Sequence, residues 1–165
     1  MQVLYYTKMT TKKEQEFLLK SARDAILNQP NIPAQDSNEL SDTLKEKKGV
    51  FVTLTISGQL RGCIGTIQPV MPLYEAVIKN AVSAAYSDPR FPPLTKEEAA
   101  ELEIEIAILT EPAKLNYNGP ADLLKKLNHE QGIILKKGFS TATFLPQVWE
   151  QLPDKEQFLA NLCIK

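Results

Sequence analysis

The sequence predicts an α+β fold in which largely antiparallel sheets are flanked by helices. Residues 50–56 alternate between apolar and polar side chains, residues 60–66 return after a short turn as the second strand of a hairpin, and residues 102–109 repeat the alternation. A second hairpin over residues 132–145 is far enough along the chain to belong to a second lobe. Because hairpins and helices follow one another without regular strand–helix alternation, we expect antiparallel rather than doubly wound sheets.

Capping residues mark where helices begin. Thr11 and Glu14 have the spacing of a capping box, and the amphipathic stretch behind them is expected to end at the proline-containing break of residues 29–33. Thr95 and Glu98 form a second box that opens a short helix. Further helices are expected around residues 40–44, over residues 73–86 and 122–127, after Pro146, and after Asp154.

Composition limits the classes of function. The formal net charge is -1, from 19 basic and 20 acidic residues, which disfavours a nucleic-acid binder. Two cysteines and one histidine supply neither a disulfide framework nor an all-protein zinc site, so we expect no metal and no cofactor. The first residues lack the apolar core of a signal peptide, and no apolar run approaches the roughly 20 residues of a membrane span. These features favour a cytoplasmic protein with reduced thiols.

The segment Leu60–Thr66, with the sequence LRGCIGT, is the strongest candidate for a functional site. Arg61 and Cys63 share a face if the strand is regular, and a cation near a thiol favours the reactive thiolate. Gly62 and Gly65 weaken a strand because they pack no side chain, which indicates a bulge, a bend or a close approach to the backbone. The pattern suits either chemistry at the thiol or docking of another molecule.

The face on which Cys63 lies depends on the hairpin register. A two-residue loop at Gly58 and Gln59 would put Cys63 on the same apolar face as Leu54. A three-residue loop would put Leu60 and Ile64 on that face and set Cys63 beside Thr53. The hydrophobic pattern normally fixes register, and it favours the second pairing. A bulge at Gly62 would change the outcome and stays open as an alternative.

Four segments, occurring in order, resemble one protein family. They are Gly49–Leu54, Leu60–Thr66, Asp88–Pro93 with the following Leu94 and Thr95, and Thr143–Trp149. Together they resemble the AMMECR family, and the likeness covers about residues 49–165. The resemblance implies antiparallel sheets in two unequal lobes, and an association of the prokaryotic members with Memo-like and radical-SAM proteins. It implies no reaction, because the biochemical activity of the family is not established.

The candidate site consists of a thiol and residues near it in the motifs. Cys63 is the candidate nucleophile, although a free cysteine is often a small buried core residue. The candidate substrate- or partner-binding residues are Arg61, Gly62, Gly65, Thr66, Thr53, Asp88 and Arg90.

The charged candidates also have structural interpretations. Arg61 is placed to form a salt bridge across the sheet with Glu103 or Glu105, and such a pair contributes little when exposed. Asp88 is placed to cap the preceding helix or to pair with Arg90 and so fix the proline-rich loop.

Four residues outside the motif are expected to be structural. His129 is the only base available to a cysteine–histidine pair, but its polar turn favours a solvated side chain. Cys163, Trp149 and Phe144 are expected to lie in the core.

Two functions remain open at this point. The favoured one is a non-catalytic module that binds a Memo-like or radical-SAM partner, because one thiol without a convincing base is an incomplete catalytic set. The alternative is an enzyme whose cleft, with Arg61 beside Cys63, uses the thiolate on a small anionic or electrophilic substrate.

Overall fold

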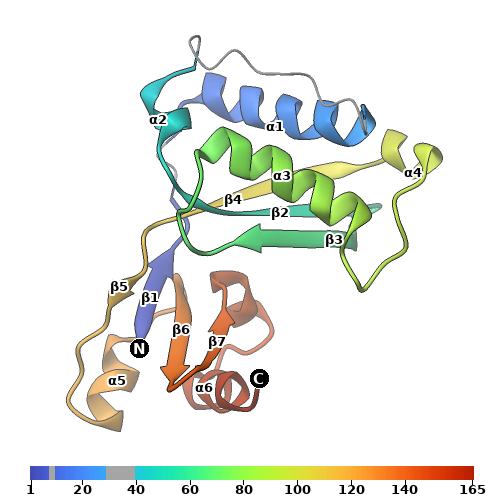
Figure 1. The fold of residues 1–165 in the computed structure, drawn as a ribbon. Coiled ribbons are helices and arrows are strands. Elements are labelled where there is room, and N and C mark those ends of the chain that lie inside the picture. Colours follow the sequence, from blue (N-terminus) through green and yellow to red (C-terminus); the bar gives the residue numbers. More distant parts are fainter. Residues whose placement is uncertain (8–9, 29–39) are drawn as a thin grey trace. The chain divides into compact units, whose positions relative to one another are not determined.

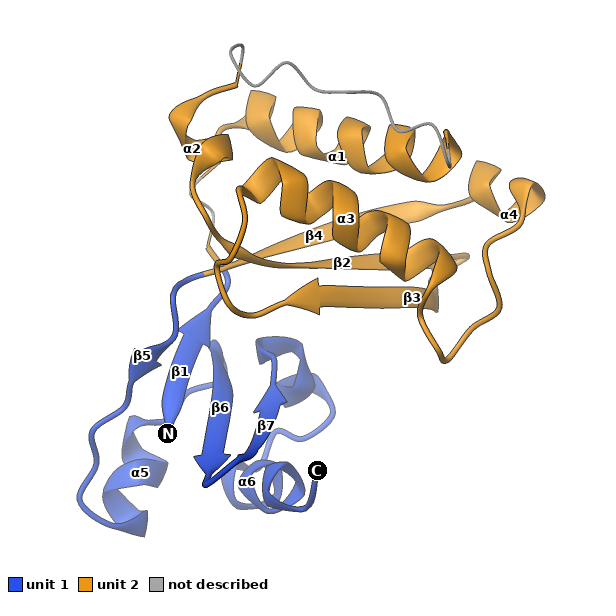
Figure 2. Cartoon of the chain, viewed as in Figure 1, with its two compact units in different colours: residues 1–6, 110–165 blue, residues 7–109 orange. Residues whose placement is uncertain are grey.

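The computed structural model describes residues 1–7, 10–28 and 40–165, so the predicted break at residues 29–33 lies outside the described residues. The chain divides into two compact units, one formed by residues 1–6 with 110–165 and the other by residues 7–109 (Figure 2). Both contain helices and antiparallel sheet, which confirms the predicted α+β class. Within the described residues, no helix combines the length and the apolar character needed to cross a membrane.

The unit of residues 7–109 is a three-stranded antiparallel sheet with its helices on one face (Figure 1). The strand order is β3-β2-β4, so β3 and β4 form the two edges. Helix α3 packs on β2 and β3, and α1 packs on α3 and β4. The elements are α1 (Lys12–Leu27), α2 (Asp42–Lys45), β2 (Gly49–Ile56), β3 (Gln59–Thr66), α3 (Leu73–Tyr86), α4 (Lys96–Ala100) and β4 (Glu103–Leu109).

Alternation along β2 explains the layered packing of this unit. Val50, Val52 and Leu54 are fully buried in the main core with the alanine-rich face of α3. The intervening Phe51 and Thr53 are half-buried on the opposite face. The two predicted capping boxes are both confirmed, at the starts of α1 and α4.

The unit of residues 1–6 and 110–165 is a four-stranded antiparallel sheet of order β5-β1-β6-β7. Its small core is built around Ile133, Trp149 and Phe158, and the Trp149 and Phe158 rings stack with centroids 3.6 Å apart. The elements are β1 (Gln2–Tyr5), β5 (Ala113–Lys114), α5 (Pro120–Lys126), β6 (Gln131–Lys137), β7 (Ser140–Phe144), the 3-10 helix η2 (Pro146–Glu150) and α6 (Lys155–Ile164).

Two predictions about this unit have different outcomes. Trp149 lies in the core as expected, but the prediction that Cys163 is a core residue is wrong, because its side chain is exposed. Helix α6 buries Phe158 and Leu162, which are four residues apart on one face, and Cys163 falls beside that face. His129 is exposed as predicted.

Candidate functional site

The turn between β2 and β3 and a bulge after it set the register of the motif. Ser57 and Gly58 form a two-residue loop with φ of 49° and 73°, values typical of the tight turns that join hairpin strands. Thr55 lies opposite Leu60 and Leu54 lies opposite Gly62, so Arg61 is an extra residue between the two pairs.

The bulge at Arg61 determines which face Cys63 occupies. With the two-residue loop and no bulge, Cys63 would lie on the apolar face, but the bulge places it opposite Thr53, as predicted. The route to that pairing was wrong, since a three-residue loop was expected. The expected placement of Ile64 on the apolar face is confirmed, since Ile64 lies opposite Val52. The same expectation was wrong for Leu60, which lies opposite Thr55 with its side chain 44% exposed.

Two glycines of the motif are needed for close packing. A Cβ atom on Gly62 would overlap the backbone carbonyl of Ala84 in α3. A Cβ on Gly65 would overlap the ring of Phe51, its cross-strand partner. The sequence-based expectation of a close approach is therefore met, and what approaches is a helix backbone at one glycine and an aromatic ring at the other.

The Asp88–Arg90 loop closes the outer edge of β3 at Cys63. The Cys63 amide donates to Asp88 Oδ2 at 2.8 Å, and Arg90 Nη2 donates to the Cys63 carbonyl at 3.1 Å. Asp88 also accepts from Arg90 through the backbone amide, Nε and Nη2, at 3.1, 2.9 and 2.6 Å. The predicted pairing of Asp88 with Arg90 is present, and it satisfies backbone groups that an edge strand would otherwise leave open.

Electrostatics stabilises the charged form of Asp88 in a buried position. The residue is only 4% exposed, and burial alone would raise its pKa. The hydrogen bond from Arg90 is the largest influence and, with the amides of Cys63 and Arg90, holds the pKa well below its usual value. Asp88 in turn raises the pKa of Arg90, and the Cys63 side chain contributes less to the same shift.

Arg61 is paired with α4 instead of with β4. Its Nε and Nη2 donate to the two carboxylate oxygens of Glu98 at 2.8 and 2.9 Å, so the predicted partners Glu103 and Glu105 were wrong. Within the described residues, Arg61 Nη1 has no hydrogen-bond partner, and no hydrogen bond joins Arg61 to Cys63. The arginine that reaches Cys63 is Arg90.

The Glu98 carboxylate has two roles in α4. It pairs with Arg61, and it accepts the Thr95 amide at 2.9 Å to complete the capping box. The Arg61 hydrogen bond, followed by that of the Thr95 amide, lowers the pKa of Glu98 to about 2.

We expect Glu98→Gln to destabilise the protein at pH 7, because it removes the ion pair with Arg61. The loss should be only about 1 kcal/mol, because the carboxylate is 34% exposed and solvent screens the pair. The loss should be full above the unfolded glutamate pKa of about 4.3 and should vanish as the pH falls towards 2, where Glu98 itself is protonated. Urea unfolding across this pH range measures the difference. Glu97→Gln in the same turn is the control, and an equal loss in both variants would contradict the prediction.

The thiol of Cys63 has a polar but incomplete environment for catalysis. Its Sγ lies 3.4 Å from Thr53 Oγ1, and the residue is half-buried. The buried hydroxyl of Thr66 has no hydrogen-bond partner among the described residues. The chain's one histidine, His129, belongs to the other unit, where its Nε2 is 2.8 Å from the Pro153 carbonyl. The described residues include no group of three or more acidic, cysteine or histidine side chains that could hold a metal ion.

One buried polar residue near the site was missed from the sequence. Asn80 in α3 is 3% exposed and donates from Nδ2 to the Val50 carbonyl at 3.1 Å, which ties the helix to the central strand. Its position four residues after Ala76 and four before Ala84 places it within the apolar stripe of α3, so helical periodicity could have revealed it.

The fold and site define an α+β protein whose glycine-rich edge strand is closed by an ion-paired loop. The chain matches the AMMECR1 family model over residues 19–165 and belongs to this family. A protein from Methanothermobacter thermautotrophicus is 40% identical over 161 residues, which cover 94% of this chain and 83% of the relative. The crystal structure of an uncharacterised protein from Pyrococcus horikoshii is similar with a TM-score of 0.82, at 38% identity, covering 94% of this chain and 80% of that one.

Proposed function

We propose that this AMMECR1-family protein is a non-catalytic cytoplasmic component that binds partner proteins, and that its partners are Memo-like and radical-SAM proteins. The partners are suggested by the family resemblance of the motifs. The proposed docking surface consists of Leu60–Thr66 and Asp88–Arg90.

The bonding around Cys63 is the observation that carries this proposal. The Cys63 amide is already bound to Asp88, so it is not free to stabilise an oxyanion. Arg90 is engaged by Asp88, and the nearest hydroxyl, that of Thr53, is not a general base at neutral pH. These contacts hold the shape of the edge strand, which suits a rigid docking surface.

An enzyme that uses the Cys63 thiolate is the second candidate. The proximity of Arg90 to Cys63 favours it, since an arginine can stabilise a thiolate or bind an anionic substrate. In this candidate enzyme, the cation beside the thiol is Arg90 and not Arg61, the residue that the sequence had suggested.

Substitutions in the Leu60–Thr66 motif distinguish the partner-binding function from the enzymatic one. We expect wild-type protein mixed with purified Memo-like and radical-SAM proteins of the same organism to form a complex with at least one of them, detected by size-exclusion chromatography with light scattering. Cys63→Ser should bind as tightly as wild type. Leu60→Glu should bind at least ten-fold more weakly, because it puts a charge on the exposed aliphatic side chain of the motif.

The control is Val70→Glu, which changes another exposed aliphatic side chain, outside the motif. If the wild-type protein binds neither candidate partner, the proposed function is wrong. If the complex with wild-type protein catalyses a reaction that Cys63→Ser abolishes, the thiolate enzyme replaces the non-catalytic component as the proposed function.

Reaction of the two cysteines with iodoacetamide gives a separate test. Cys63 is half-buried and Cys163 is exposed, so the docking proposal expects Cys63 to react more slowly at pH 7. Peptide mass spectrometry resolves the two sites within one sample, and Cys163 serves as the internal control. Faster reaction at Cys63 in the folded protein would favour the second candidate.

A further inference from the structure

Among the residues that the structure describes, the outer edge of β4 has backbone groups without a hydrogen-bond partner over part of its length. The Leu102 carbonyl accepts from Arg23 Nη2 at 2.7 Å, and the Ile108 carbonyl accepts from the Thr7 amide at 2.9 Å. Both carbonyls point away from β2. Because outward and inward groups alternate along an antiparallel strand, the amides and carbonyls of Ile104 and Ile106 also point outward. Within the described chain, these four groups have no hydrogen-bond partner.

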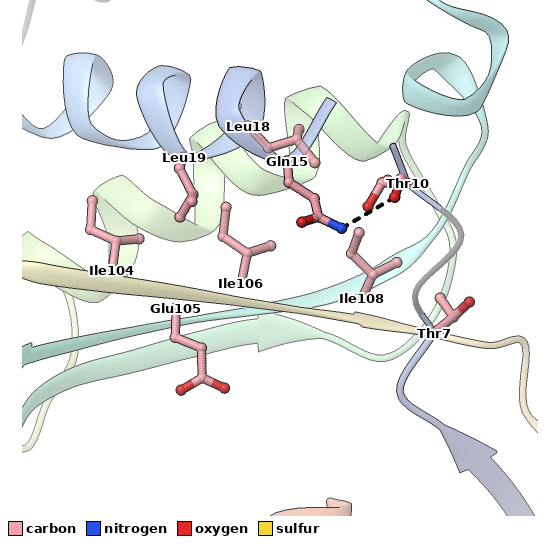
Figure 3. Close-up of a pocket in the computed structure, with 9 residues that line it drawn as sticks. All are labelled: Thr7, Thr10, Gln15, Leu18, Leu19, Ile104, Glu105, Ile106 and Ile108. Atoms are coloured by element: carbon pink, nitrogen blue, oxygen red, sulfur yellow. Dashed lines mark hydrogen bonds between the residues drawn. The ribbon is translucent and has the colours of Figure 1, made fainter. Parts of the chain in front are cut away.

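An apolar groove runs beside this free edge, between α1 and β4 (Figure 3). Its volume is about 320 Å³, and α1 contributes Leu18 and Leu19 to it. The Leu19 side chain is 40% exposed, although it lies over the groove with Ile104 and Ile106 below it. An extended chain added to β4 could place every second side chain in this groove.

The opposite face of the same strand is acidic. Glu103 and Glu105 alternate with the isoleucines, so they point to the face that the helices of this unit do not cover, and both are exposed. Thr55 donates to Glu103 at 3.2 Å, and neither carboxylate has an ion-pair partner among the described residues. An added strand would therefore meet apolar side chains on one face and negative charge on the other.

We propose that the edge of β4 binds an extended segment of a partner protein, in which apolar residues alternate with lysine or arginine. This inference rests on the proposed partner-binding function and assigns it a second docking site. The backbone groups of Ile104 and Ile106 bind the main chain of the added strand. The groove receives its apolar side chains, and cross-strand pairing with Glu103 and Glu105 selects its basic ones.

Charge excludes a second copy of this chain as the occupant. Pairing of β4 with its own copy across a two-fold axis would bring the Glu103 and Glu105 side chains of the two copies together. Like charges opposite one another destabilise a sheet, and charged residues on an edge strand are a common protection against self-pairing.

Synthetic peptides test this site directly. The acetylated and amidated heptapeptide KVKIKVK should bind at least ten-fold more tightly than EVEIEVE in isothermal titration calorimetry. In ¹⁵N-labelled protein, its binding should shift the amide resonances of Ile104 and Ile106. N-methylation of one alternate set of peptide amides should abolish binding, and methylation of the other set should leave it unchanged, because only one edge of the added strand faces β4.

Charge reversal on the strand should reverse the preference. The double variant Glu103→Lys/Glu105→Lys should bind EVEIEVE more tightly than KVKIKVK. The matched control is Glu130→Lys/Glu150→Lys, which makes the same change of charge at exposed positions in the other unit. Equal binding of both peptides to the wild type, or loss of binding with both methylated sets, would overturn the inference.

Complexes with whole partner proteins distinguish this inference from the proposed function. A complex that forms with wild type and is weakened at least ten-fold by Glu103→Lys/Glu105→Lys supports both. A complex that this variant leaves unchanged retains the proposed function and overturns the assignment of β4.

Discussion

Replacing Gly62 with alanine is expected to destabilise the unit of residues 7–109 by about 3 kcal/mol, at the upper end of the usual cost of overpacking. The added Cβ would overlap the carbonyl of Ala84, which belongs to the backbone of α3 and cannot rotate away. Relief would require α3 to move off the sheet, and the Asn80 bond to the Val50 carbonyl opposes that movement.

The effect at Gly62 can be compared with that at Gly65 in the same strand. A Cβ at Gly65 would meet the Phe51 ring, and a side chain can turn where a helix backbone cannot, so Gly65→Ala should cost less. Urea unfolding followed by far-UV circular dichroism measures both losses, and amide hydrogen exchange in β2 and β3 shows where each variant opens. An equal or larger loss at Gly65 would contradict this account of the motif.

Replacing Asp88 with alanine should cost about 3 kcal/mol at pH 7. The change removes a buried carboxylate that accepts from the Cys63 amide and from three groups of Arg90. Hydrogen bonds to charged groups contribute roughly 1.5–3 kcal/mol each, and the Cys63 amide would lose its acceptor at the strand edge. We also expect faster exchange of the Cys63 amide proton, measured by nuclear magnetic resonance.

The sign of the pH dependence follows from the lowered pKa of Asp88. A carboxylate with a depressed folded-state pKa stabilises the protein above its unfolded pKa of about 3.9, and this contribution declines as the pH falls below that value. The difference between wild type and Asp88→Ala should therefore be constant from about pH 5 to 8 and should shrink below pH 4. Asp42→Ala, at an exposed position, is the control. A difference that grows on acidification would contradict the role of Asp88.

The sequence predicted those helices and strands whose position is set by neighbouring residues in the chain. The capping boxes placed the starts of α1 and α4, and alternation placed β2 and β4. Strand β1 was missed because it has only four residues, and both strands that pair with it lie more than 100 residues along the chain. Cys163 was misplaced because two apolar residues of α6 were enough to fill the available core face.

The sequence predicted which residues belong to the site more accurately than how they are arranged. The pairing of Cys63 with Thr53 and that of Asp88 with Arg90 were anticipated from alternation and from proximity in sequence. The Arg61–Glu98 pair was not anticipated. Its two residues are 37 positions apart in the sequence, and the bulge between Leu60 and Gly62 changes the direction in which Arg61 points. The one-residue irregularity that decides this geometry leaves no reliable trace in the hydrophobic pattern.

The order of the strands in the sheet of residues 1–6 and 110–165 has a consequence for synthesis on the ribosome. Strand β1 leaves the ribosome first, yet it lies between β5 and β6, whose residues are made more than 100 positions later. All of the residues of the other compact unit emerge before either partner of β1 exists. We therefore expect the unit of residues 7–109 to complete its fold during translation, while β1 stays unpaired until β5 and β6 have been synthesised.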